Sequence, residues 1–212
     1  MAVPKIYSAL QPPVKAPLTM PTKEGDSSRA APAPQSAGVV PDLAGIWRVG
    51  PGSQAGYRVK EVLNGADVTV VGRTEEVRGS ATIAGGKVTA GTIDVGVASL
   101  TTGNGARDSY FRGKVMNVAA HPNATFTMKT PIDLPEVQDG GVKIAASGSL
   151  QLAGTVRQVP VGLTVALQGS GSVAVSGTIE IKASDFGLTA PSLGFVSVED
   201  DVVVEFLVRL EK

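Results

Sequence analysis

Apolar and polar residues alternate along most of the chain from Gly45 onward. A period of two is typical of an extended strand, because successive side chains point to opposite faces of a sheet. The clearest segment has an aliphatic residue at every second position: Val159, Val161, Leu163, Val165 and Leu167. The final segment repeats the pattern over 202–210 and carries Glu205 and Arg209 on its other face.

Weaker alternation at 143–152, 172–182, 87–97 and 67–72 predicts further strands. Glycine-rich hairpin signals separate several of them: Gly85-Gly86, Asp139-Gly140-Gly141 and Gly169-Ser170-Gly171. About eight strands at this spacing predict an all-β fold, either a sandwich or an antiparallel barrel. A barrel of this size either fills its own interior or holds one ligand, and the alternation alone favours a filled core.

The segment 99–126 interrupts this β pattern with a convincing helical turn. A compact domain rarely carries a long idle loop, so we expect the segment to cover or open something. Arg107 and Asp108 begin the short helix, where Asp108 faces the positive end of the helix dipole and Arg107 can fix the loop by charge-assisted hydrogen bonds. This structural role is favoured by about two to one over contact with the polar head of a ligand.

Proline is concentrated at the start of the chain, where the first 42 residues hold eight of the 14 prolines. This segment has no sustained apolar period, so it cannot bury enough surface to offset the entropy of ordering. Residues 1–42 are therefore predicted to be a Pro/Ala/Ser-rich linker or stalk, mostly disordered, with an arm laid along the domain as the alternative. Residues 43–212 are long enough to form one domain with a core.

The charges balance, with 19 acidic and 19 basic residues, which argues against a general nucleic-acid binder. The absence of cysteine excludes disulfides, zinc-thiolate sites and thiol nucleophiles. No apolar segment is long enough to cross a bilayer, and 3–10 is too short for a secretory signal. We therefore expect either a cytoplasmic protein or a chain without its upstream export or anchor segment.

Residue types suited to catalysis are scarce. The single histidine, His121, precedes Pro122, where the backbone is held extended, and no Gly-x-Ser-x-Gly nucleophile elbow accompanies it. The acidic segment 199–201 precedes a strand and indicates a solvated turn more than a metal site. We therefore expect no enzymatic activity, no metal and no cofactor.

Several short motifs occur in an order that resembles the YceI-like family. The motifs are Trp47, Tyr57-Arg58-Val59-Lys60, Val77-Arg78-Gly79-Ser80, Arg107-Asp108, Phe111, Met116-Asn117-Val118, His121-Pro122, Ala124-Thr125-Phe126, Gly148-Ser149-Leu150 with Val161, and Asp185-Phe186-Gly187-Leu188. Each is loose alone, but their ordered occurrence over 45–212 is specific. Gly52 and Ala153 stand where the family often has histidine, so any role of those histidines at a head group is absent here.

The resemblance implies an extended, lipocalin-like antiparallel β-barrel with one short helix or lid insertion, whose apolar tunnel binds a long-chain lipid. The family's typical ligands are polyisoprenoids, including quinones and prenyl alcohols or phosphates, and fatty-acid derivatives are an alternative. The proline-rich stalk looks most like that of surface-exposed members from high-GC Gram-positive bacteria. It implies an extracytoplasmic location near a membrane, through an anchor upstream of this chain.

We therefore expect non-catalytic binding, storage or transport of a long-chain isoprenoid lipid, since each buried methylene contributes about 0.8 kcal/mol. The wall candidates are aromatic or aliphatic residues at strand or lid positions: Trp47, Tyr57, Val59, Ile93, Phe111, Met116, Val118, Phe126, Met128, Leu163, Val165, Phe186 and Phe206. Arg107 and Asp108 are the candidates for the polar head. The alternatives are a cell-surface interaction domain with a filled barrel and, least favoured, an enzyme that acts on the lipid through His121.

Overall fold

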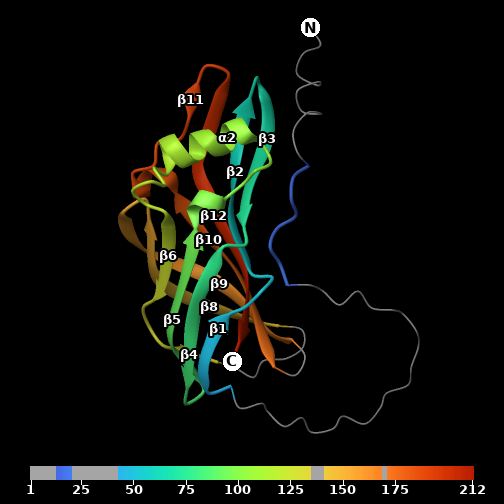
Figure 1. Cartoon of the computed structure of the whole chain (residues 1–212), viewed down its shortest axis with the longest axis vertical. Helices are drawn as coiled ribbons and strands as arrows, with labels where there is room; N and C mark the ends of the chain where they lie inside the picture. The colour runs from blue at the N-terminus through green and yellow to red at the C-terminus, as the bar shows by residue number, and fades with distance from the viewer. Residues whose placement is uncertain (1–12, 21–42, 135–140, 169–170) are drawn as a thin grey trace, which may run out of the picture.

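The computed structural model describes residues 13–20, 43–134, 141–168 and 171–212 (Figure 1). The strands are β1 (Gly45–Val49), β2 (Gln54–Leu63), β3 (Ala66–Thr74), β4 (Val77–Ala84), β5 (Lys87–Gly96), β6 (Asn123–Met128), β7 (Ile132–Asp133), β8 (Val142–Leu152), β9 (Thr155–Gln168), β10 (Ser172–Lys182), β11 (Ser192–Leu193) and β12 (Val196–Glu211). The helical elements are η1 (Val97–Ser99), α2 (Gly105–Tyr110), the π-helical turn η2 (Phe111–Val115) and η3 (Ala183–Phe186).

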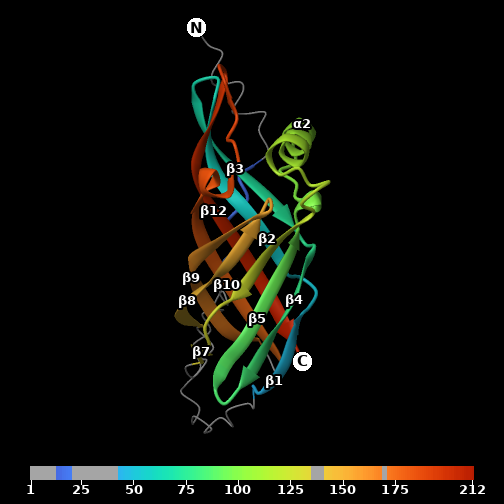
Figure 2. The same cartoon turned by 90° about the vertical axis from the view of Figure 1, so that its left-hand side faces the viewer.

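Eight of these strands form a closed antiparallel barrel in the order β1-β4-β5-β6-β8-β9-β10-β12, which confirms the predicted fold. The ring closes where the end of β12 pairs with β1, at Arg48 opposite Glu211 and Val49 opposite Leu210. The earlier part of β12 pairs instead with β2, and β3 lies beyond β2. The long strand β12 therefore belongs to the closed ring at one end and to a projecting β2–β3 hairpin at the other (Figure 2).

The segment 99–126 completes the wall beside β3, which has no strand partner on its outer side in the described part of the chain. Thr101 pairs with Arg73 there: the Arg73 amide donates to the Thr101 carbonyl at 3.1 Å, and the Thr101 amide donates to the Arg73 carbonyl at 3.0 Å. α2 follows directly and lies at the same end of the molecule as the β2–β3 hairpin (Figure 1). The predicted interruption of the β pattern is therefore a lid over this end of the barrel.

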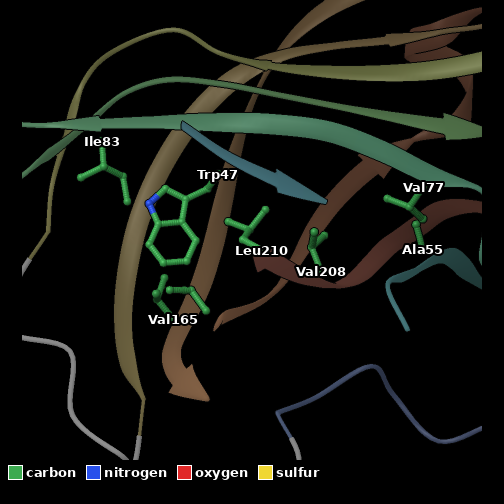
Figure 3. Packing of buried hydrophobic residues seen from close by; sticks show 8 residues of the cluster. Trp47, Ala55, Val77, Ile83, Val165, Val208 and Leu210 are labelled. Carbon is green, nitrogen blue, oxygen red and sulfur yellow. The ribbon is translucent and has the colours of Figure 1, made fainter. Parts of the chain in front are cut away.

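The opposite end of the barrel is filled by side chains. Trp47 on β1 is 3% exposed and packs in a cluster with Ile83, Val165, Val208 and Leu210 (Figure 3). Its indole nitrogen donates to the Leu43 carbonyl at 2.8 Å, so the polar edge of the ring is satisfied while the rest is buried. This cluster closes the barrel at the end where β1 completes the ring.

A second cluster lies farther along the barrel. It contains Leu150, Val159, Val161, Ile179, Ile181 and Phe186. A third, formed by Val97, Leu100 and Met116, lies between the lid and the barrel. Inward residues of β9 and β12 contribute to the first two clusters at every second position, as the alternation predicts.

Residues 13–20 run extended along the outside of the barrel, within the segment predicted as a linker (Figure 1, blue). The Arg58 guanidinium donates to the Lys15 carbonyl at 2.9 Å, and the Arg73 guanidinium donates to the Ala16 carbonyl at 2.5 Å. Leu18 is 8% exposed, and its amide donates to Glu205 at 3.4 Å. These eight residues therefore lie against the barrel, whereas residues 1–12 and 21–42, the rest of the predicted linker, lie outside the described part.

The β4–β5 hairpin turns at Gly85-Gly86 as predicted, and both glycines have positive φ. The other two predicted turns lie partly outside the described residues, although β9 and β10 do pair across one of them, from Gln168 to Ser172. No helix in the described part of the chain is long and apolar enough to span a membrane.

Candidate functional site

The lid end of the barrel contains a cavity of about 590 Å³. Its wall is built from the inward positions of several strands and includes Leu150, Ile179 and Ile181 of the second cluster. β2 contributes Ala55, Tyr57, Val59, Glu61 and Leu63, which are successive alternate residues of one strand. β12 contributes Val202, Val204 and Phe206 in the same way. The period-two pattern thus places an almost entirely apolar surface around the cavity.

α2 and η2 roof the cavity, and their start is fixed by Asn104. The Asn104 side-chain oxygen accepts hydrogen bonds from the amides of Ala106 and Arg107, each at 3.1 Å, which satisfies donors that the first turn leaves free. The cavity side of the lid carries Ala106, Arg107, Tyr110, Phe111, Val115 and Met116. The first four follow the three- and four-residue spacing of one helical face, and the π turn carries that face on to the last two.

Asp108 anchors the lid from its other side. Thr101 donates its hydroxyl to one carboxylate oxygen at 2.7 Å, and Thr102 donates its amide and hydroxyl to the other at 2.9 and 2.6 Å. Burial alone would raise the pKa of Asp108, but these hydrogen bonds outweigh it and, with Arg112, hold the pKa below its usual range. Asp108 is 6% exposed and is not part of the cavity wall, so its place is in the anchor of the lid.

Arg107 faces the cavity and forms an ion pair with Glu61 of β2. Its Nη2 lies 3.0 Å from Oε1 of Glu61, and Glu61 is 6% exposed. Both residues line the cavity, so the pair connects the lid to the barrel beside the apolar space. Burying the two charges as a pair costs less free energy than burying either charge alone.

An aromatic stack makes a second connection between barrel and lid. The rings of Tyr57 and Phe111 have centroids 5.2 Å apart and planes inclined by 19°. Burial, reinforced by the nearby Asp108 carboxylate, raises the pKa of Tyr57 well above its usual value, so the phenol stays protonated. The Tyr57 ring also covers Gly72 on β3, where an added Cβ would lie only 2.4 Å from Cε1 of the ring. The missing side chain at Gly72 lets the ring lie against the wall.

The structure places about half of the sequence-predicted residues on the cavity wall. These are Tyr57, Val59, Ile93, Phe111, Met116, Phe126 and Phe206, together with the head-group candidate Arg107. They come from β2, β5, β6, β12 and the lid, which are far apart in sequence. Their contact with a ligand stays a prediction.

The other candidates do not border this cavity, and a role for them in ligand binding stays a prediction. Trp47 and Val165 pack at the filled end, Leu163 and Phe186 belong to the second cluster, and Val118 packs against the third. Met128 on β6 lies two residues after Phe126, on the same face of the strand, and does not border the cavity. Alternation identifies the inner face of a strand but not the height along the barrel, so it cannot separate wall from filled core.

Several wall residues were not predicted. Glu61 and Leu63 continue the inward alternation of β2 beyond Val59, so extending that pattern by four residues would have found them. Phe195 and Val196 lie near the β11–β12 turn and show no signal beyond their apolar character. Their position depends on β12 projecting past the closed ring.

His121, the candidate for catalysis, lies away from the cavity. His121 precedes β6 and lies over the β8–β9 turn, where a Cβ at Gly154 would come within 2.7 Å of its Cε1 atom. It does not line the cavity. The described residues contain no group of three or more His, Cys, Asp or Glu that could hold a metal ion.

Solved structures share the fold at low sequence identity. A polyisoprenoid binding domain from Saccharophagus degradans, implicated in plant cell wall breakdown, is 20% identical, with 78% of this chain and 97% of that domain covered and a TM-score of 0.61. BcnA from Burkholderia cenocepacia is 23% identical, with coverage of 72% and 95% and a TM-score of 0.56. The YceI protein of Campylobacter jejuni is 17% identical, with coverage of 93% and 99% and a TM-score of 0.51.

None of the curated proteins compared with the chain matches it. A family model described as a YceI-like domain matches residues 47–210, which include the strands β2 to β11, the lid and most of β1 and β12. Because this match spans most of the chain, the protein belongs to the YceI-like family.

Proposed function

We propose that this protein binds a long-chain isoprenoid lipid in the lid-end cavity and acts as a non-catalytic carrier or store. The observation that carries the proposal is the apolar cavity of about 590 Å³ beneath the lid, a size within the range of small-molecule sites. Each methylene moved from water to such a wall contributes about 0.8 kcal/mol, so a long tail binds by burial alone. The likeness to a polyisoprenoid binding domain supports the same ligand class.

The charges on the wall favour a neutral polar head. The charged residues that line the cavity are Glu61, Arg107 and Glu199, with a formal sum of one negative charge. Arg107 is already paired with Glu61, and Glu199 is exposed. A phosphate needs uncompensated Arg or Lys donors, which the described wall does not offer. We therefore place isoprenoid quinones and prenyl alcohols ahead of prenyl phosphates.

The first test is to identify what the protein carries. The purified protein is extracted with organic solvent and its lipids are analysed by mass spectrometry, with the same expression host without the protein as background. Lipid-free protein is then titrated with a quinone, a prenyl alcohol, a prenyl phosphate and a fatty acid of matched tail length. We expect the quinone and the alcohol to bind more tightly than the phosphate, and tighter binding of the fatty acid would contradict the isoprenoid assignment.

A pair of variants on β10 connects binding to the cavity. Ile181→Trp adds bulk to a buried wall position, whereas Glu180→Trp adds the same side chain at the exposed neighbour on the outer face. We expect Ile181→Trp to lose lipid and Glu180→Trp to retain it. If both retain lipid, the ligand does not occupy this cavity.

The filled-barrel interaction domain is not favoured. Packed side chains fill the β1 end of the barrel, but the lid end retains open apolar space. A domain that only presented loops to another protein would have no use for that space, because an empty apolar cavity is destabilising.

A further inference from the structure

The cavity wall reaches solvent at the tip of the molecule that carries the β11–β12 turn. Phe195 lines the cavity and is 59% exposed, and Tyr110 of the lid lines it and is 41% exposed. A side chain that does both marks the place where the cavity opens. The Asn64 amide of the β2–β3 turn donates to the Phe195 carbonyl at 2.7 Å, so the two projecting turns are joined beside this opening.

The opening has an apolar rim that no described residue covers. Val62, which is 40% exposed, lies on β2 opposite Ser197 of β12, next to the same turns. Figures 1 and 2 both show β11, the β2–β3 hairpin and α2 together at one end of the molecule. Single exposed apolar residues are ordinary, but Phe195 and Tyr110 are part of the cavity wall itself, and Val62 lies on the outer face of β2 between the wall residues Glu61 and Leu63.

We propose that this rim, defined as Val62, Tyr110 and Phe195, docks onto the surface of a phospholipid bilayer. The inference rests on the proposed function, because a long apolar tail is stored in bilayers and each of its methylenes is costly to pass through water. A rim that inserts among the acyl chains lets the tail move from membrane to cavity without that passage. Phe and Tyr are suited to the boundary, since they bury an apolar ring at the level of the head groups.

Charges around the rim indicate which force dominates. Arg112 and Lys114 lie on η2 beside Tyr110, and acidic Asp67 and Glu199 lie at the same end. These opposite charges largely offset each other, so attraction to anionic lipids is a minor contribution. We therefore expect binding to persist at high salt, unlike binding by a basic patch.

The test uses the full chain with Phe195→Trp as a reporter, with the signal of buried Trp47 subtracted. Vesicles of phosphatidylcholine and phosphatidylglycerol, with and without brominated acyl chains, are added without any isoprenoid. We expect a blue shift and strong quenching by the brominated lipids at both low and high salt. Val156→Trp, at a β9 position that is 54% exposed, is the control and should not respond.

A second variant measures the strength of docking. Val62→Asp places a charge on the rim at a residue that does not line the cavity. We expect about tenfold weaker flotation with vesicles, since a lost apolar anchor of this size corresponds to about that factor. Binding of a prenyl alcohol delivered from detergent should be unchanged.

The outcomes separate this proposal from the proposed function. If the Phe195→Trp reporter does not respond to vesicles, in protein that still binds prenyl alcohol from detergent, the docking is overturned and the carrier function stands. If the reporter responds to vesicles but the protein binds no isoprenoid, the carrier function is overturned and the docking stands. A blue shift that depends on protein concentration and needs no vesicles shows a second copy on the rim and also overturns the docking, as does vesicle binding that salt abolishes.

Discussion

Arg107 of the lid and Glu61 of β2 form an ion pair in which Nη2 and Oε1 are 3.0 Å apart. Their side chains are 19% and 6% exposed, so water screens the pair little. The contact spans 46 positions of sequence and joins the roof of the cavity to its wall. It is therefore a latch that holds the lid over the cavity.

Breaking one side of the latch should cost more than removing both sides. Arg107→Met leaves the buried Glu61 carboxylate without its partner, and we expect a loss of about 1–3 kcal/mol in the free energy of unfolding. The double variant with Glu61→Met removes both charges and should recover most of that loss. Urea unfolding measures the stabilities, and stopped-flow release of a fluorescent prenyl probe measures lid opening. Equal losses in the single and double variants would mean that the pair is not a latch.

The stability of the lid anchor should decrease at low pH. The folded-state pKa of Asp108 is below its usual value because the Thr102 and Thr101 hydrogen bonds outweigh the effect of burial. The stabilisation is therefore complete above about pH 4, the ordinary value of an aspartate, and is lost as pH falls through the folded-state pKa. We expect amides of α2 to lose protection from hydrogen exchange in this range before the barrel strands do.

Asp108→Asn is the control for that dependence. The amide cannot accept all three hydrogen bonds as an anion does, so the lid should already exchange quickly at neutral pH. Further acidification should then change the exchange of α2 little. A lid that opens with the same pH profile in the variant and the native protein would show that another group controls it.

The stack of Tyr57 on Phe111 depends on the glycine behind it. In Gly72→Ala the new Cβ would lie 2.4 Å from the Tyr57 ring, which must move away from the wall. We expect the loss of the aromatic pair, worth about 0.5–1.5 kcal/mol, and weaker binding of the lipid. Gly162→Ala on β9 has no heavy atom within 4 Å of the added Cβ and should leave both properties unchanged. Thermal unfolding measures the stability of the two variants, and titration with a fluorescent prenyl probe measures their lipid binding. Equal values for the two variants would contradict the prediction.

The sequence predicts the barrel well because strand alternation is a local property. The alternate residues of β9 and β12 face inward as expected, and the period-breaking part of the segment 99–126, before β6 begins at Asn123, forms the lid. The position along the barrel axis is not local, since it follows from the register between strands. Trp47 and Phe206 therefore look alike as inward aromatics, yet one fills the closed end and the other borders the cavity.

Two ion pairs could not be predicted from the sequence, for a different reason. Glu61 pairs with Arg107, and Glu205 pairs with Arg73, across 46 and 132 positions. A buried carboxylate on a strand signals that some cation lies opposite, but not which one. The partner is decided by the lid in the first case and by the β12–β2–β3 order in the second.

The arm at residues 13–20 covers the second of these pairs. Glu205 points outward from β12 yet is only 1% exposed, with Arg73 at 2.6 Å and Arg58 at 3.5 Å. The carbonyls of Lys15 and Ala16 accept hydrogen bonds from the two guanidinium groups, and Leu18 is buried beside them. The arm is therefore held by a polar cluster on the outer wall together with one apolar anchor.

Loss of that anchor should release the arm without unfolding the barrel. Leu18→Asp removes a buried apolar side chain and adds a carboxylate near Glu205. We therefore expect the rate of tryptic cleavage after Lys15 to rise by a factor of about ten or more. Thr19→Asp adds the same charge at the exposed neighbour of Leu18, and cleavage after Lys15 should remain slow in that variant. Mass spectrometry of the digests measures both rates, and the urea midpoint of the barrel should stay constant because the arm contacts only its outer face. Equal cleavage in the two variants would show that Leu18 does not hold the arm.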